Sequence, residues 1–368
     1  MMVRYIGLLV TLLWCSGWSE MALAQSLEVK GRWLRSADGT VMVDPQPSGL
    51  MLWQQQLLSV SDRSAHVSQR LKIHPIDASR ATLNGPQWPI KLANGLKDSC
   101  FADYVTDNPD LEALTADPHN PKAFVTVTED ASRSTLTPAC AKRYGQSGST
   151  AFPTLLLRLE LQHDDSLLVT GMRPVRFAPE YRVGNFPNDG IEGLAVTPGG
   201  TLYLALEKDL AIQPRIFQIT IDERFWQSQA FIDVEDAELL LPEFASGNHP
   251  INGLAYYNPG QGAGFLLAAA RNDDQLWILD LDKALPTRML QLTFLAEAGG
   301  DCDDWQPVTY TAIEGLAVQD QTLWMMNDPW KENYLKNVIC DINRPHFQNM
   351  SALLFKLPLN PLWFKKPM

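Results

Sequence analysis

Carboxylates recur at fixed places in this 368-residue sequence. In the stretch from Asp189 to Asp209, Glu192 opens an apolar strand and Glu207 follows the next one. Counting outward from the turn at 198–200 places Glu192 opposite Glu207 at the open end of a β-hairpin. Like charges at that separation repel each other unless a cation or a shared proton relieves the repulsion. The hairpin therefore predicts a place where carboxylates meet a cation.

The same pattern is found in four further stretches. Close copies begin at Ile251 and Ile313, and weaker copies begin at Pro47 and Asp110. Each copy has a polar residue, a small apolar strand, a turn, a second apolar strand and a charged residue. We call the polar residues the opening positions and the charged residues the closing positions. The opening positions are Ser48, Glu112, Glu192, Asn252 and Glu314, and the closing positions are Asp62, Glu129, Glu207, Arg271 and Asp328.

This repeat predicts the fold. Successive opening positions lie about 60 to 80 residues apart, which suits four antiparallel strands with long loops. We therefore expect an all-β protein, a β-propeller with five or six four-stranded blades. Residues 27–34 have no hairpin of their own and are expected to pair with the C-terminal strands and close the ring. Residues 25–368 would then form a single domain.

Further apolar segments are expected to supply the outer strands. They are 67–73, 154–161, 167–177, 215–221, 275–281 and 351–357. The stretch from Pro138 to Phe152 predicts a surface loop, and the stretch from Glu235 to Phe244 is the best candidate for a short helix.

The first residues predict export. Arg4 precedes an apolar run from Ile6 to Trp14, and Ala24 ends a small-residue cleavage signal. This is the pattern of a secretory signal peptide, residues 1–24, in a periplasmic or secreted protein. The apolar run is too short for a membrane anchor, and bulky Trp14 before Cys15 disfavours a lipoprotein.

The remaining cysteines and the net charge narrow the setting. In an oxidising compartment we expect the disulfides Cys100–Cys140 and Cys302–Cys340, one of three possible pairings. A zinc site is disfavoured because close Cys-x-x-Cys spacing is absent. The formal net charge of −12 disfavours nucleic acid or an anionic membrane as the partner. It is compatible with cation binding or with solubility alone.

In a propeller the opening and closing positions converge on one mouth of the central channel. Oxygen ligands in that number and loose geometry favour Ca²⁺ over Mg²⁺. A network of acidic and basic residues without a metal is the alternative. The expected metal ligands are Glu112, Glu192, Glu207, Asn252, Glu314 and Asp328, with Asp62 and Glu129 at the same mouth.

Other side chains near these positions suggest catalytic roles. Arg63 and Arg271 could offset carboxylates or grip an anionic ligand, as could Lys208. His249 precedes Asn252 by three residues and is the best-placed candidate for a general base, the alternative being a solvated loop histidine. Three aromatic residues flank the last hairpin and would wall the pocket or pack in the core. They are Trp305, Tyr310 and Trp330.

The motifs IEGLAVTPGGTLYLALE and IEGLAVQDQTLWMMND resemble the phytase-like β-propellers called "esterase-like activity of phytase" proteins, over residues 30–360. The resemblance implies an exported propeller that binds Ca²⁺ and hydrolyses phosphoesters. It carries over to Glu192, Glu207, Glu314 and Asp328. The second copy departs with Glu112-Ala113-Leu114 and the fourth with Asn252 and Arg271, which argues against a symmetric metal cage.

The leading hypothesis is a Ca²⁺-dependent hydrolase of a small phosphoester or carboxylic ester at the channel mouth. A water activated by the cation would attack the ester while Arg271 or Arg63 steadies the developing charge. The alternatives are a lactonase and a non-catalytic binding or scaffold propeller with a structural cation. Serine-nucleophile, NAD and ATP chemistry are disfavoured because their sequence motifs are absent. The sequence leaves the oligomeric state open.

Overall fold

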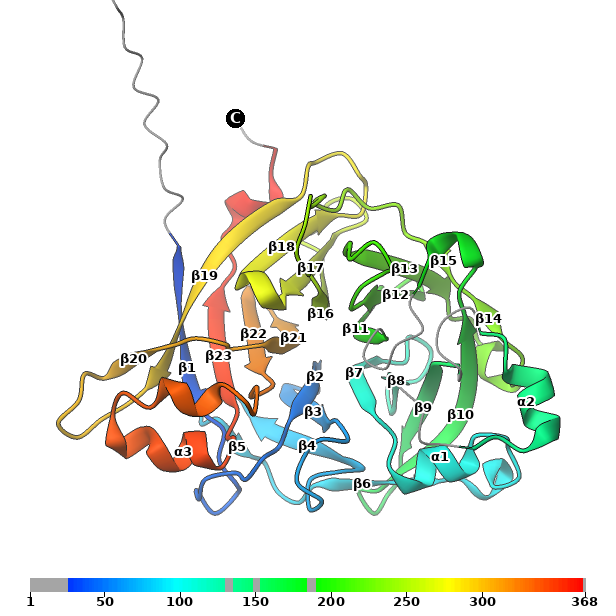
Figure 1. The fold of residues 1–368 in the computed structure, drawn as a ribbon, viewed down its shortest axis with the longest axis horizontal. Helices are drawn as coiled ribbons and strands as arrows, with labels where there is room; N and C mark the ends of the chain where they lie inside the picture. Colours follow the sequence, from blue (N-terminus) through cyan, green and yellow to red (C-terminus); the bar gives the residue numbers. More distant parts are fainter. Residues whose placement is uncertain (1–25, 130–134, 148–152, 184–189, 367–368) are drawn as a thin grey trace, which may run out of the picture.

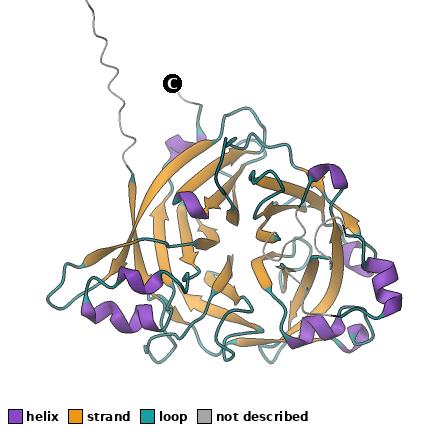
Figure 2. Ribbon diagram, viewed as in Figure 1, coloured by secondary structure: helices purple, strands orange, loops and turns teal. Residues whose placement is uncertain are grey.

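The computed structural model describes residues 26–129, 135–147, 153–183 and 190–366. The predicted signal peptide lies outside these residues. Strands dominate the described part, and most of the short helices lie at its periphery, although one lies further in (Figure 2). Sheets are arranged around a central axis, as Figure 1 shows. The protein is an all-β propeller, as the repeat predicts.

The described strands form sheets of nine, ten and four strands, because β19 pairs with β1 and β6 pairs with β10; we divide them into five four-stranded units, which we call blades. The strands of each blade are given from the axis outward. Blade 1 has β2 (Pro47–Trp53), β3 (Gln56–Ser61), β4 (Lys72–Asp77) and β6 (Trp88–Leu92). Blade 2 has β7 (Leu111–Ala116), β8 (Ala123–Thr128), β9 (Leu155–Leu161) and β10 (Leu167–Arg176). Blade 3 has β11 (Ile191–Val196), β12 (Thr201–Leu206), β13 (Arg215–Thr220) and β15 (Glu235–Asp236).

The last two blades complete the ring. Blade 4 has β16 (Ile251–Tyr257), β17 (Phe265–Ala270), β18 (Gln275–Asp280) and β19 (Arg288–Glu297). Blade 5 has β21 (Ile313–Gln319), β22 (Thr322–Asn327), β23 (Leu353–Pro358) and β1 (Leu27–Trp33). The additional short strands are β5 (Thr82–Leu83), β14 (Ile232–Asp233) and β20 (Trp305–Val308), and the helices are α1 (Ala102–Asp107), α2 (Pro138–Tyr144) and α3 (Arg344–Gln348).

The innermost strands form a closed ring. Strand β2 contacts β7, β7 contacts β11, β11 contacts β16, β16 contacts β21, and β21 contacts β2. The N-terminal strand β1 pairs antiparallel with β23 and parallel with β19, so it completes the last blade. The predicted closure by this strand is confirmed.

A glycine after the opening position lets neighbouring inner strands touch. A Cβ atom on Gly253 would lie 2.5 Å from the carbonyl oxygen of Glu314 on the next strand. A Cβ on Gly49 would lie 2.5 Å from the carbonyl carbon of Ala113. The backbones therefore approach too closely for any side chain there. Ala113 replaces this glycine in blade 2 and adopts φ 51°.

Both predicted disulfides are confirmed. Cys100–Cys140 joins the segment before α1 to helix α2, and Cys302–Cys340 joins the segment before β20 to the loops before α3. Two disulfides indicate an oxidising environment outside the cytoplasm. Within the described ranges, no helix combines the length and the apolar character that crossing a membrane requires.

Three local predictions were wrong. The segment from Glu235 to Phe244 is not a helix, because β15 occupies its start and Pro242 interrupts the rest. Pro138–Tyr144 is helix α2 rather than loop, capped by the Thr137 side chain, which accepts a hydrogen bond from the Cys140 N–H. Strand β4 begins at Lys72 instead of Val67, after Leu71 with φ 52°. Residues 148–152 of the predicted loop lie outside the described residues.

Candidate metal centre

Each opening position lies at an irregularity of its hairpin. Ile191 pairs with Leu206 and Gly193 with Ala205, so Glu192 is the extra residue of a β-bulge. The prediction that Glu192 lies opposite Glu207 was therefore wrong, and the N–H of Glu207 instead donates to the carbonyl of Gly190. Bulges redirect a side chain out of the regular alternation. The same shift occurs at Ser48, Asn252 and Glu314, and one residue later, at Ala113, in blade 2.

The redirected carboxylates nevertheless meet on the axis. Oxygens of Glu112, Glu192 and Glu314, from β7, β11 and β21, lie within 4.8 Å of one another. Glu192 also belongs to a second group and Glu112 to a third. These groups are Glu129–Glu192–Glu207 and Asp62–Asp110–Glu112. Because they share members, the three groups form one continuous set, which we call the acidic cluster.

Most of the acidic cluster lines a cavity of about 310 Å³, which we call the acidic cavity. The structure brings together here most of the predicted site residues. Its predicted members are Asp62, Arg63, Glu112, Glu129, Glu192, Arg271, Glu314, Asp328 and Trp330, and further members include Gln46, Ser64, Asp110, Pro329 and Lys331. Glu207 is the member of the acidic cluster that does not line the cavity.

Burial and mutual repulsion make the carboxylates hard to ionise. Burial raises the pKa of Glu112 and Glu192 well above its ordinary value, and neighbouring carboxylates raise it further. For Glu129 and Glu314 burial raises the pKa to about 8, although Arg271 opposes the shift at Glu314. Protons therefore compensate part of the charge when no cation is bound.

Two arginines compensate another part of the negative charge of the carboxylates. The Arg271 guanidinium donates to Glu314 Oε1 at 2.9 Å. Burial disfavours the charged form of Arg271, but Glu314 and Asp328 outweigh burial and raise its pKa. Arg63 Nε lies 2.8 Å from Asp110 Oδ2. Both predicted arginines are thus bound by carboxylates of the cavity.

Buried polar atoms without a hydrogen-bond partner among the described residues occur on Glu129 and Asp328 in the cavity wall, and on Asn252, which does not line the cavity. Glu129 Oε1 lines the acidic cavity and has no hydrogen-bond partner among the described residues. Asn252 is fully buried, and neither its Oδ1 nor its Nδ2 has a partner in the described part of the chain. Buried polar atoms are nearly always paired with protein, water or an ion. Unpaired oxygens beside clustered carboxylates fit a hard divalent cation.

The structure does not bring His249 to the acidic cavity. Its Nδ1 lies 2.9 Å from Asp273 Oδ1, and its Nε2 lies 3.0 Å from the carbonyl oxygen of Ser246. The ring stacks on Phe244. Both nitrogens are occupied on the loop, so the imidazole serves the loop structure. The predicted metal ligand Asn252 also lies outside the cavity lining, as do Lys208, Trp305 and Tyr310.

Sequence reasoning missed Asp110 and Lys331. Asp110 begins the second repeat, two residues before Glu112, and this position was the available signal. Lys331 follows the closing position Asp328 by three residues, and its Nζ bonds Asp44 Oδ2 at 3.0 Å and the Ser64 carbonyl at 2.6 Å. Nothing in the repeat pattern marks this lysine.

Further along the axis the lining becomes apolar. A second cavity of about 180 Å³ is lined by inner-strand residues beyond the opening positions. Every inner strand contributes a leucine, namely Leu50, Leu114, Leu194, Leu254 and Leu316. The acidic cluster therefore has an apolar wall on its inner side, which explains the strong effect of burial on its carboxylates.

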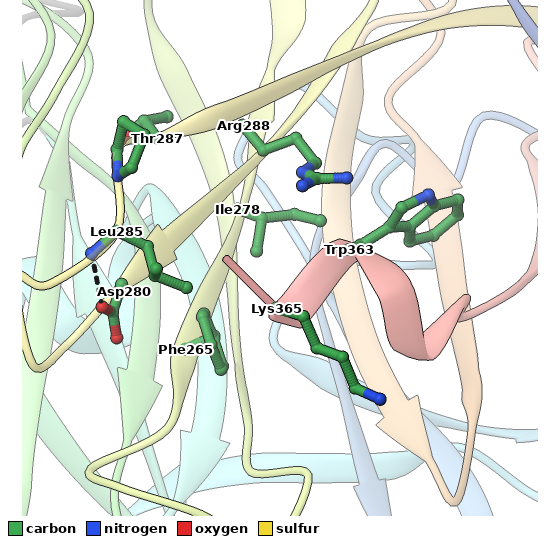
Figure 3. Close-up of a pocket in the computed structure, with 9 residues that line it drawn as sticks. Phe265, Ile278, Asp280, Leu285, Thr287, Arg288, Trp363 and Lys365 are labelled. Carbon is green, nitrogen blue, oxygen red and sulfur yellow. Dashed lines mark hydrogen bonds between the residues drawn. The ribbon is translucent and has the colours of Figure 1, made fainter. Parts of the chain in front are cut away.

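The cavity in Figure 3 is separate from the acidic cluster. It has a volume of about 220 Å³ and lies between β18, β19 and the C-terminal turn Pro361–Phe364. Its carboxylate, Asp280, accepts hydrogen bonds from the backbone of Asp282, Ala284 and Leu285. Asp280 thus stabilises its own loop, and the cavity contains none of the predicted site residues.

No protein-family model and no curated protein matches this chain. Among solved structures it is similar to a GH43 β-1,3-galactosidase, with TM-score 0.44, 9% identity and coverage of 88% of this chain and 58% of the other. A GH130 glycoside hydrolase that targets β-1,2-mannosidic linkages gives TM-score 0.43, 12% identity, and 91% and 87% coverage. The PQQ-bound aldose sugar dehydrogenase from Streptomyces coelicolor gives a TM-score of 0.36 and 11% identity, with coverage of 84% of this chain and 93% of the other. These values are too low to support a functional conclusion.

Proposed function

We propose that this chain is an exported β-propeller that binds Ca²⁺ in the acidic cavity and hydrolyses a small phosphoester or carboxylic ester there. The observation that carries the proposal is the convergence of Glu112, Glu192 and Glu314 from three blades onto the axis. A fold that gathers buried carboxylates at such a cost in repulsion is best explained by a cation that offsets it.

The donor set favours Ca²⁺. Carboxylate oxygens are hard ligands, and the acidic cluster offers many of them; Ca²⁺ accepts six to eight oxygens in loose geometry, whereas Mg²⁺ needs a near-ideal octahedron. Glu112, Glu192 and Glu314 would be central ligands. Glu129 and Asn252 have unsatisfied oxygens that could complete the shell.

A divalent cation held there would supply Lewis acidity that polarises an ester oxygen and lowers the pKa of a nearby water. The chain supplies the surrounding charge. Arg271 lines the cavity and uses one donor for Glu314, while a guanidinium has five. Its other donors would stabilise the negative charge that develops on the ester.

The test combines calorimetry with activity. We expect Ca²⁺ to raise the melting temperature, a chelator to lower it, and a panel of phosphoesters, carboxylic esters and lactones to show Ca²⁺-dependent hydrolysis. Glu192→Gln and Glu314→Gln should each weaken Ca²⁺ binding at least tenfold. Exposed Glu223→Gln is the matched control and should bind like the unmodified chain. Unchanged Ca²⁺ binding in both cavity variants would refute the site.

One observation favours a second candidate, a non-catalytic propeller with a structural cation. Both cavity arginines already bind carboxylates, Arg63 to Asp110 and Arg271 to Glu314. Such pairs suit a site whose only role is to hold blades together. Ca²⁺-dependent stabilisation without hydrolysis of any panel member would select this candidate, and hydrolysis restricted to lactones would indicate a lactonase.

A further inference from the structure

Two exposed aromatic side chains form a corner at the edge of the acidic cavity. Trp330 lines the cavity and is 42% exposed. Tyr310 is 45% exposed, and its ring centroid lies 5.6 Å from that of Trp330, with the ring planes at 73°. Large aromatic side chains are usually buried, so exposure of both beside a cavity is unusual.

The backbone holds Tyr310 outward at a cost. Its φ is 55°, a region that residues other than glycine seldom adopt. The buried Asn337 side chain fixes the preceding residue on both sides. Asn337 Oδ1 accepts from the N–H and the hydroxyl of Thr309, and Asn337 Nδ2 donates to the Thr309 carbonyl at 2.9 Å. The orientation of Tyr310 is therefore built into the turn.

Trp330 is fixed independently. Its carbonyl accepts from the N–H groups of Asn333 and Tyr334. The carbonyl of Pro329, just before it, accepts from Gln46 Nε2 at 3.2 Å. The corner is thus presented by a rigid segment on each side, with little conformational freedom to lose on binding.

The surroundings of the corner favour a flat apolar ring. Leu335 follows in the same segment and is 47% exposed, while the Lys336 ammonium lies 5.8 Å from the Tyr310 ring. A sugar ring would need several polar groups at its edges, and on the side of the corner outside the cavity lining Tyr310 and Leu335 offer few of them. An aromatic ring can stack on one aromatic side chain and meet a second one edge to face.

We propose that the ligand of the acidic cavity is an ester with an aromatic group, whose ring stacks on Trp330 with its edge toward Tyr310. The anionic end of the ligand then reaches the cation site, so this inference rests on the proposed function. Trp330 and Tyr310 act in substrate selection and need not touch the reacting atoms.

Equilibrium binding tests this without requiring turnover. Phenylphosphonate and methylphosphonate carry the same anionic group and differ in the ring. In the presence of Ca²⁺, titration calorimetry on the full mature chain should give at least tenfold tighter binding of phenylphosphonate. Trp330→Ala should remove most of that ratio, Tyr310→Ala part of it, and Trp330→Phe should retain most of it. Methylphosphonate affinity should change less than twofold in all three variants.

Trp305→Ala is the control, because Trp305 is a half-buried tryptophan on β20 outside the cavity lining. It should leave the ratio unchanged. Equal binding of the two phosphonates, or a ratio that survives Trp330→Ala, would overturn the inference while Ca²⁺-dependent hydrolysis still stood. Glucose 6-phosphate binding as tightly as phenylphosphonate would overturn the aromatic assignment. If neither phosphonate binds in the presence of Ca²⁺, this inference fails. If the ester panel also shows no Ca²⁺-dependent hydrolysis, the proposed function fails as well.

Discussion

Asn252 is an opening position whose side-chain amide has no hydrogen-bond partner among the described residues. It occupies the opening position of blade 4, where three other blades carry glutamate, and both of its amide atoms are buried and unpaired within the described residues. An amide buried without a partner costs about 1–3 kcal/mol. The amide is retained most easily if an ion or a water completes its coordination.

We therefore expect Asn252→Leu to have opposite effects with and without Ca²⁺. In chelator it should stabilise the fold by about 1 kcal/mol, because leucine removes an unpaired polar group at similar volume. With Ca²⁺ it should bind the ion at least fivefold more weakly. Urea unfolding under both conditions measures the two effects. Destabilisation in chelator together with unchanged Ca²⁺ affinity would show that the amide is no ligand.

The raised pKa values of the acidic cluster predict how stability depends on pH. The pKa of Glu129 and Glu314 is about 8 in the folded chain, against an ordinary value of 4.5. The folded state therefore binds more protons, and its stabilisation is complete below about pH 4.5 and lost as pH rises to 8. Each group contributes up to about 1.4 kcal/mol per pH unit in that window.

In chelator, the free energy of unfolding should accordingly fall between pH 5 and pH 8. Ca²⁺ should suppress the fall, because it stabilises the ionised carboxylates, and its binding at pH 7 should release protons. Calorimetric titrations in two buffers of different ionisation enthalpy would count those protons. A chelated protein that gains stability from pH 5 to 8 would contradict the assignment.

At the scale of elements, the inner strands are spaced by glycine. Gly253 faces the Glu314 carbonyl of the next strand so closely that one methyl group would push β16 and β21 apart. We expect Gly253→Ala to lower the free energy of unfolding by about 2–3 kcal/mol, the usual cost of overpacking. It should also weaken Ca²⁺ binding, since Glu314 would move.

Gly95→Ala is the matched control for this glycine. Nothing lies within 4 Å of a Cβ atom at Gly95, and its φ lies outside the left-handed region. The free energy of unfolding of the Gly95→Ala variant should differ from that of the unmodified chain by less than about 0.5 kcal/mol. Urea denaturation of both variants gives the comparison, and equal stability of the two would refute the close-packing argument.

The hairpins could be predicted from sequence because the repeat pattern is local. Glu-Gly-Leu-Ala, the turn and the second apolar strand identify β11 and β21 directly, and the closing strand β1 follows from its lack of a hairpin. The bulge at Glu192 could not be predicted, because β11 is buried on both faces and its sequence has no alternation whose phase an extra residue would visibly shift. The position of His249 depends on Asp273 and Phe244, contacts that no local pattern encodes.

At the scale of the whole molecule, the acidic cluster depends on ring closure. The proposed ligands Glu112, Glu192 and Glu314 come from blades 2, 3 and 5, and blade 5 is complete only when β1 pairs with β23. Fully buried Val29 and Trp33 anchor β1, and Trp33 stacks on His346 with ring centroids 4.5 Å apart. Strand β1 therefore holds the last blade, and with it Glu314, in place.

A chain that begins at Ser36 should consequently lose both the fold and the site. Without β1, the edges of β23 and β19 lie open to pairing with other chains, so association or aggregation is expected. We expect a melting temperature at least 10 °C lower and no Ca²⁺-dependent stabilisation, measured by circular dichroism and size-exclusion chromatography. Adding back residues 26–35 as a peptide should restore part of both, because the β1 position is then filled. A monomeric shortened chain that still binds Ca²⁺ would show that four blades and part of the fifth suffice to assemble the acidic cluster.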